Sequence, residues 1–75
     1  MKIIYTKHAI IKMYSYGIEV GKVEDTIISG EKKLEGKRDN KYRAVKRYGD
    51  EKIHVVFIII DNDILKVLTC RKVRA

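Results

Sequence analysis

The chain has 75 residues and a formal net charge of +7 at pH 7, with 17 lysines and arginines against 10 acids. This length supports one hydrophobic core, which excludes a second domain and predicts a single domain over residues 1–75. One cysteine and two histidines that lie far apart in sequence exclude an internal disulfide and a zinc site, and we expect no metal or other cofactor.

The first part of the chain predicts a short strand and two helices. Lys2–Tyr5 is rich in isoleucine and alternates weakly, which is typical of an opening strand. Thr6 is a good N-cap for a helix whose apolar residues recur at helical spacing up to Gly17, where a left-handed glycine would end it. Glu19–Ser29 has a second apolar stripe and is closed by Gly30. The short connection between the two helices predicts a helical hairpin.

From Glu31 onward the apolar period changes to two, which predicts strands. Lys32–Leu34 is expected to be a short edge strand, and Lys41–Tyr48 is a longer strand with alternating side chains. Ile53–Ile60 is apolar at nearly every position, which is typical of a central strand covered on both faces, and Ile64–Cys70 is the last strand. The sequence therefore predicts a small α+β domain in which a helical hairpin packs on one face of an antiparallel sheet, in the order strand, helix, helix and four strands.

Helices on one face would leave the other face of this sheet open, where the alternation places either the Tyr42 set or the Arg43 set of the basic strand. Arg43 and Arg47 are an even number of residues apart, so they project to the same side of their strand, and so do Thr69 and Arg71. His54 is the polar residue of the apolar central strand, so it needs a hydrogen-bond partner or an opening to solvent. We interpret it either as a strand-end histidine near water or as an acid, base or phosphate contact. Together these residues predict a nucleic-acid-binding surface.

The first helix carries a second candidate pair. His8 lies at its start, and Lys12 lies one turn later on the same face, so the two can address one ligand. The positive end of the helix dipole disfavours the imidazolium, which would keep His8 available as a neutral base, while Lys12 neutralises a phosphate. The simpler interpretation, that His8 only caps or packs the helix start, stays open.

These residue types suit the cleavage of RNA by its own 2′-hydroxyl. That reaction needs a base for the hydroxyl, an acid for the leaving oxygen and cations for the developing charge, and histidine, lysine and arginine supply all three without a metal. The basic composition favours an anionic partner, although a thermophile-like surface rich in lysine and glutamate explains it equally well. Cys70 is expected to pack in the core rather than to act as a nucleophile.

Location and assembly follow from the same composition. The longest apolar run, Val55–Ile60, is much shorter than the roughly 20 residues of a membrane-spanning helix, and the N-terminus lacks the apolar segment of a signal peptide. We therefore expect a cytoplasmic protein without a membrane partner. Because so small a core is marginally stable, a homodimer is a reasonable expectation.

Several motifs resemble a known family. His8-Ala9, Met13 and Gly17-Ile18 resemble the opening signature His-Ala-x-x-Arg-Met-x-x-x-Gly-Ile of small bacterial and archaeal proteins in domain-of-unknown-function family 4258. This chain departs from that signature at Lys12, which keeps the charge of arginine without its bidentate fork. The remaining matches are Val23 and Gly30 in the second helix, Tyr42-Arg43 in the basic strand and Val67-Leu68-Thr69 in the last strand.

That family is similar to the RelE-like group of ribonuclease-toxin folds, which includes barnase, EndoU and colicin. The resemblance implies a metal-independent ribonuclease of toxin–antitoxin type, with RNA, at or away from the ribosome, as substrate and a small acidic antitoxin as protein partner. In this interpretation His8, Lys12, Arg43 and Arg71 are the catalytic residues, and Arg43, Arg47, His54, Thr69 and Arg71 bind the RNA. Two alternatives stay open: a nucleic-acid-binding module without catalysis, and a protein-interaction domain whose charge serves solubility.

Overall fold

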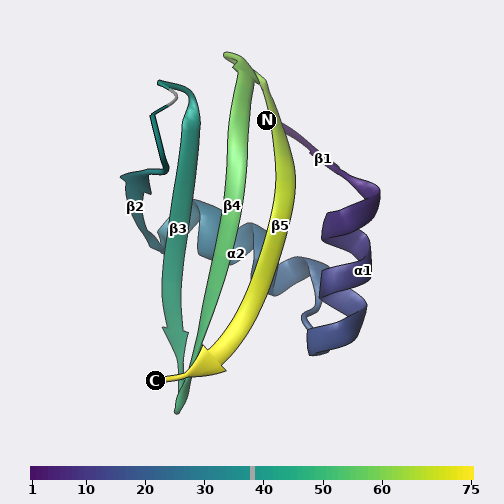
Figure 1. Cartoon of the computed structure of the whole chain (residues 1–75), viewed down its shortest axis with the longest axis vertical. Coiled ribbons are helices and arrows are strands. Elements are labelled where there is room, and N and C mark those ends of the chain that lie inside the picture. Colours follow the sequence, from purple (N-terminus) through teal and green to yellow (C-terminus); the bar gives the residue numbers. More distant parts are fainter. Residues whose placement is uncertain (38) are drawn as a thin grey trace.

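The computed structural model describes residues 1–37 and 39–75, which form two helices against one five-stranded sheet (Figure 1). The order of elements confirms the predicted order. In chain order they are β1 (Lys2–Tyr5), α1 (Lys7–Tyr16), α2 (Val20–Ser29), β2 (Glu31–Leu34), β3 (Lys41–Tyr48), β4 (Glu51–Asp61) and β5 (Ile64–Arg74). Within the described residues, neither helix has the length and apolar character needed to cross a membrane.

The sheet is mixed rather than wholly antiparallel. Its strands lie in the order β1-β5-β4-β3-β2, and the strands from β2 to β5 form the expected antiparallel meander with β4 at the centre. β1 pairs in parallel with the first part of β5, from Lys2 opposite Ile64 to Tyr5 opposite Val67. The sequence did not predict this pairing because a parallel neighbour is set by a long crossover, not by a local turn.

The ends of α1 confirm the local signals in the sequence. The Thr6 side chain accepts a hydrogen bond from the backbone N–H of Ala9 at 3.0 Å, as an N-cap does. Gly17 has a left-handed φ of 64°, which lets the N–H of Ile18 reach the carbonyl of Met13 at 2.9 Å. In Figure 1, α1 lies alongside β5, whereas α2 runs across the strands behind the sheet. The two helices share a short connection but cover different parts of the sheet.

The hydrophobic core lies between the helices and one face of the sheet. Val23 and Ile27 of α2 and Val55 and Phe57 of β4 are all buried in it. The expectation that β4 is covered on both faces fails at its far end, where Ile60 is 48% exposed. That end of the strand extends beyond the helices (Figure 1), so neither helix covers it.

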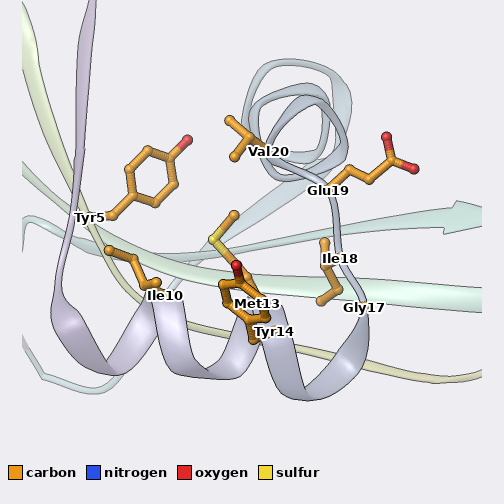
Figure 2. A pocket seen from close by; sticks show the side chains of 8 residues that line it. All are labelled: Tyr5, Ile10, Met13, Tyr14, Gly17, Ile18, Glu19 and Val20. Atoms are coloured by element: carbon orange, nitrogen blue, oxygen red, sulfur yellow. The ribbon is translucent and has the colours of Figure 1, made fainter.

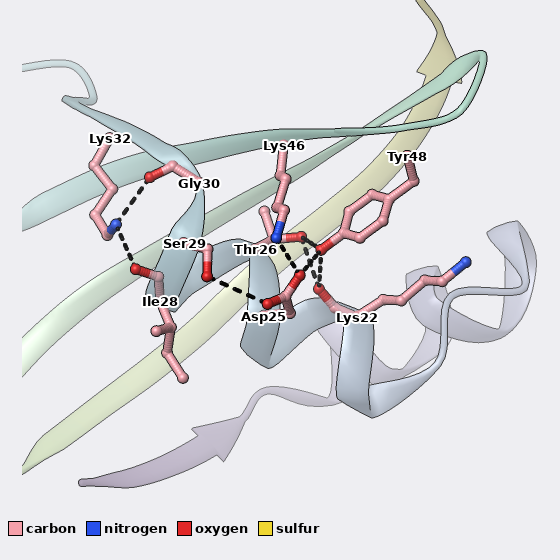
Figure 3. Close-up of polar contacts among 9 residues, drawn as sticks. All are labelled: Lys22, Asp25, Thr26, Ile28, Ser29, Gly30, Lys32, Lys46 and Tyr48. Carbon is pink, nitrogen blue, oxygen red and sulfur yellow. Dashed lines mark hydrogen bonds and ion pairs between the residues drawn. The ribbon is translucent and has the colours of Figure 1, made fainter.

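A cluster of polar contacts fastens α2 to β3 (Figure 3). Asp25 accepts hydrogen bonds from Lys46 Nζ and from the Tyr48 hydroxyl, both at 2.6 Å, and the Thr26 and Tyr48 hydroxyls lie 3.1 Å apart. The hydrogen bond from Lys46, followed by that from Tyr48, holds the pKa of Asp25 below its usual value. This side of β3 therefore faces the helices, and the structure decides between the two sets that the alternation left open: Arg43 lies on the opposite, open side.

Candidate functional site

The sheet face opposite the helices carries charged and polar side chains that are neighbours across the strands. Side chains on one face of paired strands lie about 5 Å apart when they are in register. From β2 to β5, one row across this open face is Lys33, Arg43, Val56 and Thr69, and the next is Glu31, Val45, His54 and Arg71.

Helix α1 closes one end of the open face and forms a cleft with it. Because β1 pairs only with Ile64–Val67, α1 lies beside the rest of β5, where the Thr6 hydroxyl donates to the carbonyl of Leu68 at 3.0 Å. This arrangement brings Lys12 and Tyr16 to a cleft of about 350 Å³. Its other lining residues are Arg43, His54, Val56, Thr69, Cys70 and Arg71.

Arg43 is held in this cleft by a carboxylate from the loop between β2 and β3. Its Nε and Nη2 donate to the two oxygens of Glu35 at 3.1 and 2.6 Å, which is a bidentate ion pair. The hydrogen bonds of this pair lower the pKa of Glu35 and raise that of Arg43. The remaining Nη1 lies 3.2 Å from Nδ1 of His54. Glu35 therefore compensates the charge of Arg43 and orients its free amino group.

His54 is a neutral imidazole in this setting. A guanidinium only donates hydrogen bonds, so Nδ1 of His54 accepts from Arg43 and the ring hydrogen is assigned to Nε2. Burial lowers the pKa of His54 below 6.5, and the nearby charges of Arg71, Arg43 and Lys52 lower it further. The ring is thus unprotonated at neutral pH, as a general base has to be.

The other cations of the cleft are Lys12 and Arg71. Neither forms an ion pair with another residue in the two described ranges. Lys12 Nζ lies 5.9 Å from the centre of the Tyr16 ring, within the range of a cation–π contact. Cys70 is buried, and burial raises the pKa of its thiol, so it packs in the core as expected. In the described part of the chain, no group of three or more His, Cys, Asp or Glu side chains is placed to hold a metal ion.

The structure brings together most of the residues that the sequence singled out. The cleft contains Lys12, Arg43, His54, Thr69 and Arg71. His8 is exposed at the start of α1 and is not among the residues that line the cleft. Arg47 is also outside it, exposed near the end of β3, where its Nε donates to the carbonyl of Gly49 at 2.8 Å.

Sequence reasoning missed Tyr16 and Glu35 as members of the site. Tyr16 lies four residues after Lys12 on the same face of α1, and that spacing could have predicted it. Glu35 lies in a polar loop, and its pairing with a residue eight positions later has no local signal in the sequence.

A larger hollow, of about 620 Å³, lies between α1, the start of α2 and β1 (Figure 2). Its lining is mostly apolar and includes Ile10 and Met13. The charged side chain at its rim is Glu19, and nearby the Tyr5 hydroxyl donates to Glu24 at 3.2 Å. Carboxylates at an apolar hollow do not suit an anionic ligand, so the cationic cleft is the candidate site.

The fold and the site define a small basic α+β domain with a cationic cleft on the open face of its sheet. Residues 5–70 match the family described as Domain of unknown function (DUF4258). The match covers most of the chain, and the protein belongs to this family, as the resemblance of its motifs indicated. Among curated proteins, none matches the chain as a relative.

A solved structure has the same fold. The crystal structure of the ribonuclease toxin BrnT of Brucella abortus is similar to this chain with a TM-score of 0.68. The likeness covers 100% of this chain and 99% of that chain, at 18% sequence identity. At this identity the likeness confirms the expected α+β fold alone, and fold does not establish function. The grouping with RelE-like folds stays a prediction.

Proposed function

We propose that the protein is a ribonuclease of toxin type that binds single-stranded RNA in the cleft and cleaves its phosphodiester backbone. One observation carries the proposal: four elements, α1, β3, β4 and β5, each bring a cationic or titratable side chain to the same cleft. These side chains are Lys12, Arg43, His54 and Arg71. Such groups bind phosphate and stabilise the charge that develops during its transfer. The description of BrnT as a ribonuclease toxin supports the same class of activity.

In the proposed reaction His54 is the base. A bound phosphate competes for Nη1 of Arg43 and so frees Nδ1 of His54 to accept the proton of the RNA 2′-hydroxyl. The 2′-oxygen forms a bond to phosphorus while the bond from phosphorus to the 5′-oxygen breaks. The imidazolium then returns the proton to the leaving 5′-oxygen, which yields a cyclic phosphate and a 5′-hydroxyl. Lys12 and Arg71 neutralise the phosphate throughout.

His54→Ala tests this assignment. We expect RNA cleavage to fall by roughly a hundredfold to ten-thousandfold, the usual contribution of a general base, while RNA binding at low salt is retained. The wild-type rate should decline on the acid side at a pH below 6.5, because the imidazole is protonated there and cannot accept the proton. Assays run with EDTA, beside a melting curve, measure both effects. Cleavage that survives in a folded His54→Ala protein would remove His54 from the mechanism.

The same assay decides between the two histidines. Because His8 is exposed and lies outside the residues that line the cleft, the proposal gives the role of base to His54. If His8→Ala abolishes cleavage and His54→Ala does not, the base predicted from the helix motif is the correct one.

Binding without catalysis is the second candidate. Lys12 and Arg71 form no ion pair with another described residue, so they can bind phosphate even if no base acts beside them. This candidate predicts RNA affinity that falls steeply with salt and no cleavage by the wild type, with or without ribosomes. In either case an acidic antitoxin is the expected protein partner, since its carboxylates would compete with phosphate for the same cations. Displacement of RNA by such a protein checks this, and size measurement in solution checks the expected homodimer.

A further inference from the structure

A second hollow adjoins the cleft on the open face of the sheet. Its volume is about 330 Å³, close to that of the cleft. Arg43 and His54 line both hollows, so these two side chains separate them. The other residues that line the second hollow are Glu31, Lys33, Val45 and Lys52. The proposed function makes no use of this second group.

The second hollow is lined by cations like the cleft, and it also includes a carboxylate. Lys33 and Lys52 are exposed, and neither forms an ion pair with another described residue. Val45 between them offers apolar surface. Glu31 is the carboxylate of this hollow, and its oxygens can accept a hydrogen bond from a ribose hydroxyl but repel a phosphate. The hollow therefore has the groups that one nucleotide needs: cations for phosphate, apolar surface and an acceptor for the sugar.

The strand registers place the two hollows on one line across the sheet. Lys33 of β2 lies opposite Arg43 of β3, and His54 of β4 lies opposite Arg71 of β5. Neighbouring strands are about 4.8 Å apart, so β2 and β5, which are three spacings apart, are separated by about 14 Å. One phosphate cannot bridge that distance, whereas a short single strand of nucleic acid that crosses the sheet spans it.

We propose that the second hollow is a nucleotide subsite, in which Lys33 and Lys52 bind the phosphate that neighbours the scissile one. The subsite rests on the proposed function and adds a path to it: the RNA strand crosses the sheet from α1 to β2. The protein should then prefer a substrate with several phosphates over one with a single phosphodiester.

The test compares a ribodinucleotide, which fills the cleft alone, with a single-stranded hexaribonucleotide that reaches both hollows. Lys33→Gln and Lys52→Gln, separately and together, remove charge while keeping most of the side-chain stem. Lys22→Gln is the matched control, because Lys22 is exposed on α2, on the other side of the sheet. Affinity is measured between about 50 and 200 mM salt, the range in which phosphate contacts are lost. A melting curve confirms that each variant is folded.

For the hexanucleotide, each lost phosphate contact should reduce the slope of log affinity against log salt by about 0.7. Because both lysines bind the same phosphate, the double variant loses one phosphate contact, so across this fourfold salt range its affinity should fall about 2.6-fold less than that of the wild type. The dinucleotide should bind all variants alike, and Lys22→Gln should match the wild type with both ligands.

Equal hexanucleotide slopes for the wild type and the double variant overturn the subsite, and so does an equal effect of Lys22→Gln. Failure of the proposed function gives a different result. If the wild type binds the hexanucleotide and Lys33→Gln weakens it, but His54→Ala still cleaves, the subsite stands and the catalytic assignment falls. If the wild type binds neither ligand, both proposals fall.

Discussion

Glu35→Gln should change RNA binding and RNA cleavage in opposite directions. Glu35 accepts hydrogen bonds from Nε and Nη2 of Arg43 at 3.1 and 2.6 Å and so compensates the guanidinium charge beside the cleft. Glutamine keeps the shape of the side chain without its charge, so Arg43 neutralises in full the phosphate that contacts its Nη1. One more neutralised phosphate steepens the salt dependence by about 0.7 in log–log slope. The variant should bind RNA more tightly than the wild type at about 50 mM salt. Between about 50 and 200 mM salt, its affinity should fall about 2.6-fold more than that of the wild type.

Cleavage should fall in the same variant. The bidentate pair with Glu35 fixes Nη1 of Arg43 beside Nδ1 of His54 at 3.2 Å, so a phosphate that takes up Nη1 is held next to the base, and a guanidinium without this anchor no longer holds it there. A displacement of about 1 Å at a reacting group costs up to about a hundredfold in rate. Removal of Glu35 also lowers the pKa of His54 further, because the charge of Glu35 raises that pKa.

Two assays separate these effects. Fluorescence anisotropy with an RNA that carries a 2′-deoxy residue at the cleavage site measures binding, and the unmodified RNA measures cleavage. Glu19→Gln is the control, because it makes the same change in net charge at the apolar hollow on the helix side of the sheet. Binding and cleavage that move together would refute the reasoning, as would an equal effect of Glu19→Gln.

Four further variants test stability and titration. Gly30→Ala should destabilise the fold by about 1–3 kcal/mol as overpacking does, since a Cβ there would lie 2.4 Å from the carbonyl oxygen of Thr26. Gly21→Ala, with nothing within 4 Å in α2, should instead stabilise it by about 0.5–1 kcal/mol. Urea unfolding measures the stability change of both variants. Equal changes would contradict the close approach of Thr26 to Gly30. The pKa of Asp25 is lowered from 3.8, so the contribution of Asp25 to the free energy of unfolding is present above that pH and is lost as the pH falls through the pKa of the folded state. Asp25→Asn should flatten this acid dependence of unfolding. An unchanged profile would contradict the prediction. Burial, followed by the charge of Glu24, raises the pKa of Tyr5 to about 12. The contribution of the neutral Tyr5 hydroxyl to the free energy of unfolding is therefore complete below pH 10.0 and is lost as the pH rises to about 12. Because the pKa of Tyr48 is also raised, phenolate absorbance should show the late titration reduced by one group in Tyr5→Phe, and an unchanged late titration would refute the assignment.

The order of the elements was predictable because each boundary has a local cause. Thr6 caps α1, Gly17 ends it in a left-handed conformation, and the apolar period changes after Gly30. The parallel pairing of β1 and the exposure of Ile60 were not predictable, because both depend on where the helices lie over the sheet. Local chemistry determines where elements begin and end, and packing determines which of them become neighbours.

The site divides in the same way. Alternation groups Arg43 with Arg47 and Thr69 with Arg71, but only the register between the strands brings Arg43, His54 and Arg71 to one face. Helical spacing alone could not tell His8 from Lys12, since both lie on one face of α1. A helix rises about 1.5 Å per residue, so His8 lies about 6 Å nearer the N-terminal end of α1 than Lys12 does. Because the cleft lies at the Lys12 end of the helix, only the tertiary structure separates the two.

The cleft exists because β1 is short. Its four residues pair with β5 only as far as Val67, and the Thr6 hydroxyl donates a hydrogen bond to the carbonyl of Leu68 just beyond. A longer β1 would occupy this edge and keep α1 away from the open face. The approach also needs a small side chain: Ala9 is fully buried, and Cys70 Sγ lies 4.0 Å from its carbonyl oxygen. A larger residue at position 9 would move α1 outward and take Lys12 from the cleft. The alanine of the first motif thus determines where the cation of that motif lies.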